Sequence, residues 1–329
     1  TWPKGWTHTM KWKEETVHLG ARFDPNHAGK GWKIAEVIPN GPSDQTISKI
    51  HPGETILKVG EEEISENAPL SAYLNRRPSE PVNLTVADKE GKQRDVKIMP
   101  ISYSAARKLA QNARIDATAE AVDKLSGGKL GYIHVARMMW DEFEKFEHHL
   151  YGQGAGKDGL VIDVRNNGGG FTTDHLLTAL CQPQHAFTIP RNGGAGYPQD
   201  RIVYATWNKP IIVLCNQNSF SNAEIFAHAI RNLNRGKLVG VATAGGVIST
   251  GSTKVLDAGS MRLPFRGWFS AIDGEDMELN GAQPHITIWN QPGELSAGKD
   301  VQLEKAVQTL LKETQTTPGY PKEKYRSAR

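Results

Sequence analysis

Residues 19–102 carry their apolar side chains in short runs that mostly alternate with polar residues and stop at turn signals. Such alternation is typical of strands with one buried face, and clusters of Gly, Pro and Asn separate these strands. The runs predict strands in residues 19–24, 32–38, 54–60, 62–65, 82–88 and 94–100, and short helices in residues 43–50 and 68–77. We therefore expect a small β-rich domain at 19–102.

From residue 103 to residue 316 the pattern changes to longer amphipathic stretches that alternate with continuous apolar runs. Apolar runs of this length are typical of strands buried on both faces, and the alternation with helices indicates an α/β domain with a central sheet. The predicted strands are 129–136, 158–165, 210–216, 237–243 and 253–264, and the predicted helices are 102–124, 141–151, 172–181, 222–233 and 299–313. Residues 317–329 are predicted to be a polar tail.

Composition narrows the possible functions of this chain. Its 329 residues suffice for two or three domains, and 38% hydrophobic with 23% charged residues is typical of a globular protein. The net charge is only +3, with Lys and Arg spread along the chain, so we expect no nucleic-acid partner. The apolar runs are too short for a membrane span. The opening TWPKGWTHTMKW has no signal-peptide pattern, which favours an internal point of a longer or processed precursor.

Cys181 and Cys215 are the two cysteines, and both lie in apolar surroundings. We expect two buried free thiols rather than a disulfide or a metal site. This leaves the compartment open between a cytoplasmic and a periplasmic or secreted location.

Ser221 stands where a predicted strand passes into a predicted helix, and it allows two interpretations. It precedes Glu224 by three positions, which is the capping-box pattern of a helix start. It could also be a nucleophile, because backbone N–H groups at a helix start can hold a developing oxyanion.

The stretch VIDVRNNGGG, residues 161–170, bears on this choice. Three consecutive glycines cost conformational entropy, so they suit either a flexible turn or a backbone that must approach a ligand closely. In the second case, the N–H groups of Gly169 and Asn222 would converge on one oxygen at the carboxyl ends of neighbouring strands.

DVRNNGGG followed by NSFSNAEIF resembles the serine peptidases of the carboxy-terminal processing protease and tricorn superfamily. In the processing-protease branch, a lysine base lies about 25 residues beyond the serine, where this chain has Gly246; Lys254 is close but off the pattern. The tricorn branch has TAGG there, as this chain does at 243–246, and LPFRGWFSAIDGEDMELNGAQPHI and GKDVQLEKAVQTLL also match. The chain therefore resembles the tricorn branch.

The resemblance extends to residues 19–102, which look like a PDZ domain. The matching stretches are LGARF, GWKIAEVIPNGPSD and IHPGETILKVGEEEI, and the resemblance implies peptide binding near Gly20 and Phe23 by strand addition. It implies a fold in which the PDZ domain is inserted between a short N-terminal catalytic segment, residues 1–18, and an α/β peptidase core of the crotonase-like and ClpP-like type at 103–316.

The resemblance also implies roles for individual residues. Ser221 would be the nucleophile, His8 the base, and Glu278 the acid that orients His8 through the hydroxyl of Thr7. His18 competes with His8 for the role of base but lacks a preceding hydroxyl residue.

The implied reaction is hydrolysis of peptides or unfolded proteins through an acyl-enzyme, with Gly169 and Asn222 forming the oxyanion hole and with no metal or cofactor. Family members assemble into rings, so the resemblance also implies a homo-oligomer. Tricorn has an acidic specificity residue, but neither Asp174 nor Asp200 matches its position, and Arg191 lies in that region. The tricorn preference for basic residues is therefore not carried over to this chain, and its specificity stays open.

Two other functions stay open. The chain could be a catalytically degenerate module that only binds peptides, which the replacement of the family's serine by Thr7 would favour. It could also be a processing protease with a Ser221–Lys254 dyad.

Overall fold

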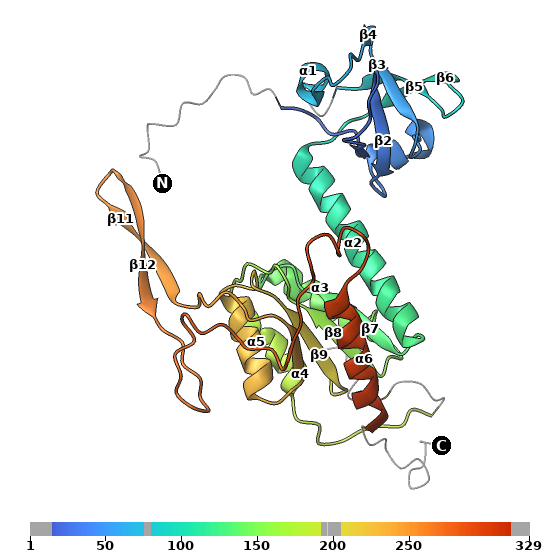
Figure 1. Ribbon diagram of the computed structural model, residues 1–329. Coiled ribbons are helices and arrows are strands. Elements are labelled where there is room, and N and C mark those ends of the chain that lie inside the picture. The colour runs from blue at the N-terminus through green and yellow to red at the C-terminus, as the bar shows by residue number, and fades with distance from the viewer. Residues whose placement is uncertain (1–14, 76–79, 192–195, 197–204, 317–329) are drawn as a thin grey trace. The chain divides into compact units, whose positions relative to one another are not determined.

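The computed structural model describes residues 15–75, 80–191, 196 and 205–316, and these residues form two compact units (Figure 1). One unit comprises the described residues up to 117 and the other those from 118 onward. Helix α2, Tyr103–Ser126, contains residues of both units. No helix among the described residues is long and apolar enough to cross a membrane.

The first unit is an antiparallel β domain, as its alternating sequence predicts. Its strands run in the order β1-β2-β3-β5-β6, with the short β4 paired to β3. Their bounds are Ala21–Phe23 (β1), Trp32–Val37 (β2), Thr55–Val59 (β3), Glu62–Glu63 (β4), Val82–Ala87 (β5) and Gln93–Ile98 (β6). The inward-facing residues of these strands, such as Ile34, Ile56 and Leu84, form one hydrophobic core.

Of the two short helices that the sequence predicts in this unit, one is confirmed and the other is not. Helix α1, Leu70–Leu74, lies within the predicted stretch 68–77. The stretch 43–50 instead forms two separate 3₁₀ turns, Pro42–Asp44 and Thr46–Ser48, because Gln45 between them is extended with φ −69° and ψ 141°.

The second unit is built on a parallel sheet with the strand order β13-β10-β9-β8-β7. The strands are Leu130–His134 (β7), Gly159–Asp163 (β8), Ile211–Cys215 (β9), Lys237–Gly240 (β10) and Ile286–Thr287 (β13). The helices are Trp140–Tyr151 (α3), Thr173–Cys181 (α4), Asn222–Asn232 (α5) and Val301–Thr316 (α6). The predicted alternation of strands and helices in an α/β domain is confirmed.

Helices cover both faces of this sheet, which explains the continuous apolar runs of its strands. Ile162 and Val213 belong to a core that also contains Phe146 of α3, Leu176 of α4 and Phe226 of α5. Helix α6 packs against β8, β9 and β10 and buries Leu303, Val307 and Leu310 (Figure 1). Every residue of β8 and β9 is buried.

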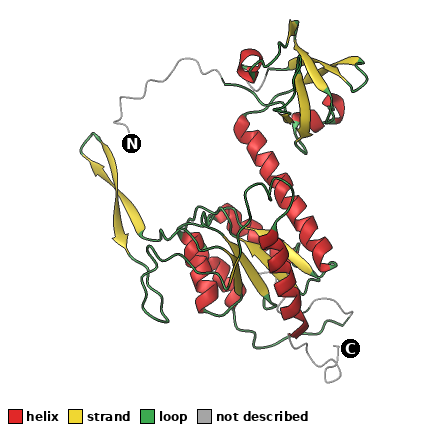
Figure 2. Cartoon of the chain, in the orientation of Figure 1, coloured by secondary structure: helices red, strands yellow, loops and turns green. Residues whose placement is uncertain are grey.

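The predicted strand at 253–264 is instead part of a hairpin. Strands β11, Ser249–Val255, and β12, Gly259–Arg266, pair with each other in a two-stranded sheet, which Figure 2 shows as a separate yellow ribbon. The chain reverses at residues 256–258, where Leu256 has φ +47°, so a turn interrupts the run that the sequence pattern treats as continuous.

The order of the parallel strands determines which loops meet. Strands β8, β9 and β10 are neighbours and point the same way, so the loops that follow them lie at one edge of the sheet. These loops carry the glycine run 168–170, Ser221 and residues 243–248 respectively.

Candidate active site

Ser221 occupies a sharp turn between β9 and α5 and has a strained backbone. Its φ is +57° and its ψ is −120°, a combination that side-chain-bearing residues rarely adopt and that costs about 1–3 kcal/mol. An ordinary helix N-cap residue has an extended backbone instead. Strain of this kind at a strand-to-helix turn is typical of nucleophilic serines, where it exposes the hydroxyl.

Local hydrogen bonds hold this turn in place. The Phe220 N–H donates to the Asn167 carbonyl at 2.9 Å, and the Ser221 N–H donates to Glu224 Oε1 at 2.9 Å. The predicted capping box between Ser221 and Glu224 is therefore present. The helix-start interpretation is confirmed, but it leaves the strained conformation of Ser221 unexplained.

The glycine run lies directly against Ser221. A Cβ atom on Gly169 would lie 2.7 Å from Ser221 Cβ, 2.8 Å from the Phe220 carbonyl oxygen and 3.0 Å from the Asn222 nitrogen, and Gly169 has φ +92°. Glycine is thus required there for both space and conformation. The expected close approach of the backbone is present, and a flexible turn does not account for it.

The two amides expected to form an oxyanion hole differ in their present partners. The Gly169 N–H donates to Oδ1 of the fully buried Asn167 at 2.9 Å. The Asn222 N–H has no acceptor among the described residues. Asn222 itself is anchored, since its side-chain Oδ1 accepts the Thr173 N–H at 2.9 Å.

Glu224 links the serine turn to the loop that follows β10. The carboxylate has no exposed surface. Oε1 accepts the N–H groups of Ser221 and Gly246, each at 2.9 Å, and Oε2 accepts the Thr243 hydroxyl at 2.7 Å and the Gly245 N–H.

Glu278 is bound by the next two amides of the same loop. Its Oε2 accepts the Val247 N–H at 2.7 Å and the Ile248 N–H at 2.9 Å. Asp276, a neighbour in sequence, instead accepts the Glu278 N–H at 2.9 Å. The sequence-predicted acid is therefore attached to the loop that Glu224 ties to Ser221.

The two positions considered for a lysine base, Gly246 and Lys254, differ in their surroundings. A Cβ atom on Gly246 would lie 2.3 Å from the Phe220 ring, next to Ser221 in sequence. Lys254 lies on the exposed strand β11, paired with Ser260.

A buried ion-pair network supports the turn after β8. Arg165 pairs with Asp163 at 2.7 Å and with Asp300 at 2.9 Å, and the Tyr132 hydroxyl donates to Asp163 at 2.9 Å. Burial alone would raise the pKa of Asp163, but the charge and hydrogen bonds of Arg165 outweigh it and hold that pKa below its ordinary value. The network orients the start of the stretch that ends at Gly169.

His18 belongs to the first unit and is already engaged there. Its Nδ1 accepts the Gly20 N–H at 2.9 Å, and its ring packs edge-on against Tyr103 with a centroid distance of 4.9 Å. Burial, and secondarily the charge of Arg22, lowers the pKa of His18. An Nδ1 that accepts leaves the proton of neutral imidazole on Nε2, which is the wrong tautomer for a base acting through Nε2. Thr7 and His8 lie outside the described residues.

The described residues considered for substrate specificity, Asp174 and Arg191, are not brought together in one pocket. Asp174 lies on the exposed side of the first turn of α4, and Arg191 is exposed. Asp200 lies outside the described residues. Sequence reasoning missed the part played by Asn167, and it interpreted Glu224 only as a capping residue.

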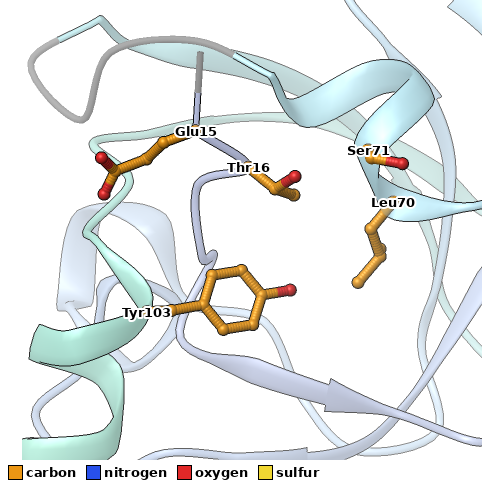
Figure 3. Close-up of a pocket in the computed structure, with 5 residues that line it drawn as sticks. All are labelled: Glu15, Thr16, Leu70, Ser71 and Tyr103. Carbon is orange, nitrogen blue, oxygen red and sulfur yellow. The ribbon is translucent and has the colours of Figure 1, made fainter. Parts of the chain in front are cut away.

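The expected peptide-binding residues lie in β1 and just before it, and β1 is the terminal strand of the sheet in the described part of the first unit. Gly20 has φ +82° and is packed so closely on Pro42 that a Cβ atom would lie 2.6 Å from it. Phe23 ends β1, which is the terminal strand of its sheet. The same unit has an open cavity of about 600 Å³ in which Tyr103 and Leu70 face each other, lined also by Glu15, Thr16 and Ser71 (Figure 3).

Comparison with known families identifies both units. Residues 129–288 match peptidase family S41, and residues 18–103 match the tricorn protease PDZ domain. The predicted resemblance to tricorn proteases is thus confirmed at the level of the family.

Individual relatives agree with this result. Tricorn protease homolog 1 of Streptomyces coelicolor is 28% identical over 92% of this chain and 28% of its own length. Tricorn protease of Thermoplasma acidophilum is 27% identical over 79% of this chain and 24% of its own length. The crystal structure of the tricorn protease matches with a TM-score of 0.79 and 23% identity over 92% of this chain and 29% of that one, which supports the fold. The chain spans about three-tenths or less of the length of these relatives.

Proposed function

This chain belongs to peptidase family S41, with a PDZ domain of the tricorn type, and from that premise we propose that it is a serine endopeptidase acting through an acyl-enzyme at Ser221. The observation that carries the proposal is the strained Ser221, with φ +57°, in contact with a glycine that tolerates no side chain. A helix cap requires neither feature. Both are useful if a substrate carbonyl must reach the hydroxyl.

The proposed reaction uses an activated serine. His8 accepts the proton of the Ser221 hydroxyl as Oγ attacks the scissile carbonyl carbon, and it then gives that proton to the leaving amine. Water subsequently hydrolyses the ester on Ser221, with the same histidine as base. Glu278, acting through the Thr7 hydroxyl, orients His8 and stabilises its cation.

In this proposal, the Asn222 and Gly169 amides stabilise the tetrahedral oxyanion. The absence of an acceptor for the Asn222 N–H among the described residues supports its part in this role. The Gly169 N–H can contribute only by leaving Asn167 Oδ1 for the oxyanion. Loss of one oxyanion donor typically costs about a hundredfold in rate or more.

We assign peptides and unfolded proteins as substrates. The PDZ domain would take an extended peptide by strand addition beside Gly20 and Phe23. Among the described residues, β1 pairs with β2 on one side and with no named strand on the other, which supports this assignment. A homo-oligomer is part of the proposal because the resemblance to tricorn proteases implies one.

The two alternatives have less support. A Ser221–Lys254 dyad would need a base that lies instead on the exposed hairpin. A module that only binds peptides would need neither strain at Ser221 nor a carboxylate attached to the adjoining loop.

Labelling with a fluorophosphonate probe, read by mass spectrometry, tests the proposal. We expect label on Ser221 of the wild type and none on Ser221→Ala or His8→Ala. His18→Ala is the matched control and should keep its label. Folded wild-type protein that stays unlabelled would refute the peptidase and favour the binding module. Label that is lost in Lys254→Ala but kept in His8→Ala would favour the dyad.

A further inference from the structure

We infer that Glu224 is a positioning residue that fixes the separation of Ser221 and Glu278 through the loop 243–248, an inference that rests on the proposed function. Glu224 forms one half of the capping box with Ser221. A cap needs only the bond from the Ser221 N–H. The other three donors to its carboxylate, Thr243, Gly245 and Gly246, come from the loop beyond β10.

The burial of this carboxylate shows that the contact with the loop is specific. Carboxylates are seldom fully buried unless their charge is compensated. Glu224 has no exposed surface, and no Lys, Arg or His in the described part of the chain forms an ion pair with it. Its compensation comes from three backbone N–H groups and one hydroxyl, which are fixed donors. Any shift of Ser221 relative to the loop would break at least one of these bonds.

The same loop binds Glu278 with its next two amides. Gly245 and Gly246 donate to Glu224, and Val247 and Ile248 donate to Glu278, so four consecutive N–H groups are divided between two carboxylates. The distance between the serine turn and the proposed acid is therefore set by four residues of backbone.

Further contacts stiffen this connection. The Ala244 N–H donates to the Ser219 carbonyl at 3.0 Å, and the Leu279 N–H donates to the Gly245 carbonyl at 2.9 Å. Gly245 has φ +79°, so the loop takes a conformation that glycine permits. The loop is thus tied on one side to the residues before Ser221 and on the other to the residue after Glu278.

Such a connection matters because the proposed relay acts across this distance. Glu278 reaches Ser221 only through Thr7 and His8, so an error in its position passes to the base. A displacement of about 1 Å in an active site can reduce the rate about a hundredfold. Glu224 touches neither substrate nor the transferred proton, and its effect should pass through Ser221 and Glu278.

Glu224→Gln tests the inference, because glutamine keeps the shape but replaces one acceptor oxygen with a donor. With a peptide substrate, we expect kcat and the rate of Ser221 labelling to fall by about tenfold to a hundredfold while KM changes by less than about twofold. Because the inferred role of Glu224 is to hold Ser221 at a fixed separation from Glu278, Glu224→Gln should cost much less in a Glu278→Gln background, where that separation matters less. Ile230→Ala on the same helix is the control for lost stability, and it should keep the wild-type labelling rate.

The outcomes are separable. Equal costs of Glu224→Gln in both backgrounds, or an unchanged labelling rate, would overturn the inference while leaving the peptidase intact. Wild type that cannot be labelled would overturn the proposed function and this inference with it. If Glu224→Gln does not fold, Glu224→Asp replaces it, because aspartate keeps the charge but is too short to bind both the Ser221 turn and the loop 243–248. Glu224→Asp should also cost less in the Glu278→Gln background, and equal costs in the two backgrounds would again overturn the inference.

Discussion

Replacing Gly169 by alanine tests whether the glycine run exists to let backbone approach Ser221. The added Cβ would meet three atoms at 3.0 Å or less, all of them belonging to residues 220–222, while φ is +92°. A residue with a side chain in a left-handed conformation costs about 1–2 kcal/mol. Overlap in a packed region adds about 1–3 kcal/mol. We therefore expect the free energy of unfolding to fall by about 2–5 kcal/mol, unless the loop moves away from Ser221.

Movement of the loop would relieve the overlap but displace the proposed oxyanion donor. We accordingly expect Gly169→Ala to lower the rate of fluorophosphonate labelling by about a hundredfold or more, even where the protein remains folded. The assay pairs that rate with urea denaturation followed by circular dichroism.

Gly168→Ala is the matched control for this substitution. A Cβ atom at residue 168 would meet no atom within 4 Å, and its φ is not positive. It should keep the labelling rate and could gain about 0.4–1 kcal/mol, because alanine restricts the unfolded chain. Equal effects of the two alanines, or wild-type labelling of Gly169→Ala, would refute the close-approach argument.

Three further predictions concern strain, charge and thiol chemistry. Ser221→Gly should abolish labelling yet raise the free energy of unfolding by about 1–2 kcal/mol in urea titrations, because glycine relieves the strain at φ +57°. Asp163→Asn should lower the free energy of unfolding by about 3–5 kcal/mol, because Arg165 would lose its buried partner. Since the folded-state pKa of Asp163 lies below the unfolded value of about 3.9, its stabilisation is present above that pH and is lost as pH falls through the folded pKa. Burial raises the pKa of the Cys215 thiol to about 12, so Ellman's reagent at pH 8 should modify Cys181 first and Cys215 only on unfolding.

Each of these has an outcome that contradicts it. A destabilised Ser221→Gly would mean that the serine is not strained. If the free energy of unfolding depends on pH in the same way in Asp163→Asn and in wild type, the Asp163–Arg165 ion pair does not contribute to the loss of stability at low pH. Rapid modification of Cys215 in the native protein would contradict its burial in β9.

Much of this architecture was already encoded in local pattern. Period-two alternation is a property of each strand by itself, and continuous apolar runs such as 211–215 require cover on both faces wherever they occur. The sequence pattern predicts less well where turns interrupt a strand or a helix. The reversal at 256–258 was missed although Asp257 and Gly259 are turn-type residues, because the apolar Val255 and Leu256 continue the strand pattern into the turn, where Leu256 adopts φ +47°. Residues 43–50 likewise show apolar spacing suited to a helix, yet the extended Gln45 divides them.

The sequence alone determined the two kinds of domain, the helix start at Ser221 and, through resemblance, the family and its proposed catalytic residues. Only the tertiary structure decided that Gly169 touches Ser221 and that Glu224 and Glu278 share one loop. The physical reason is that these contacts join residues about 20 to 50 positions apart in sequence. Strand order brings them together, and no local pattern of side chains records which backbone amide a distant carboxylate will accept.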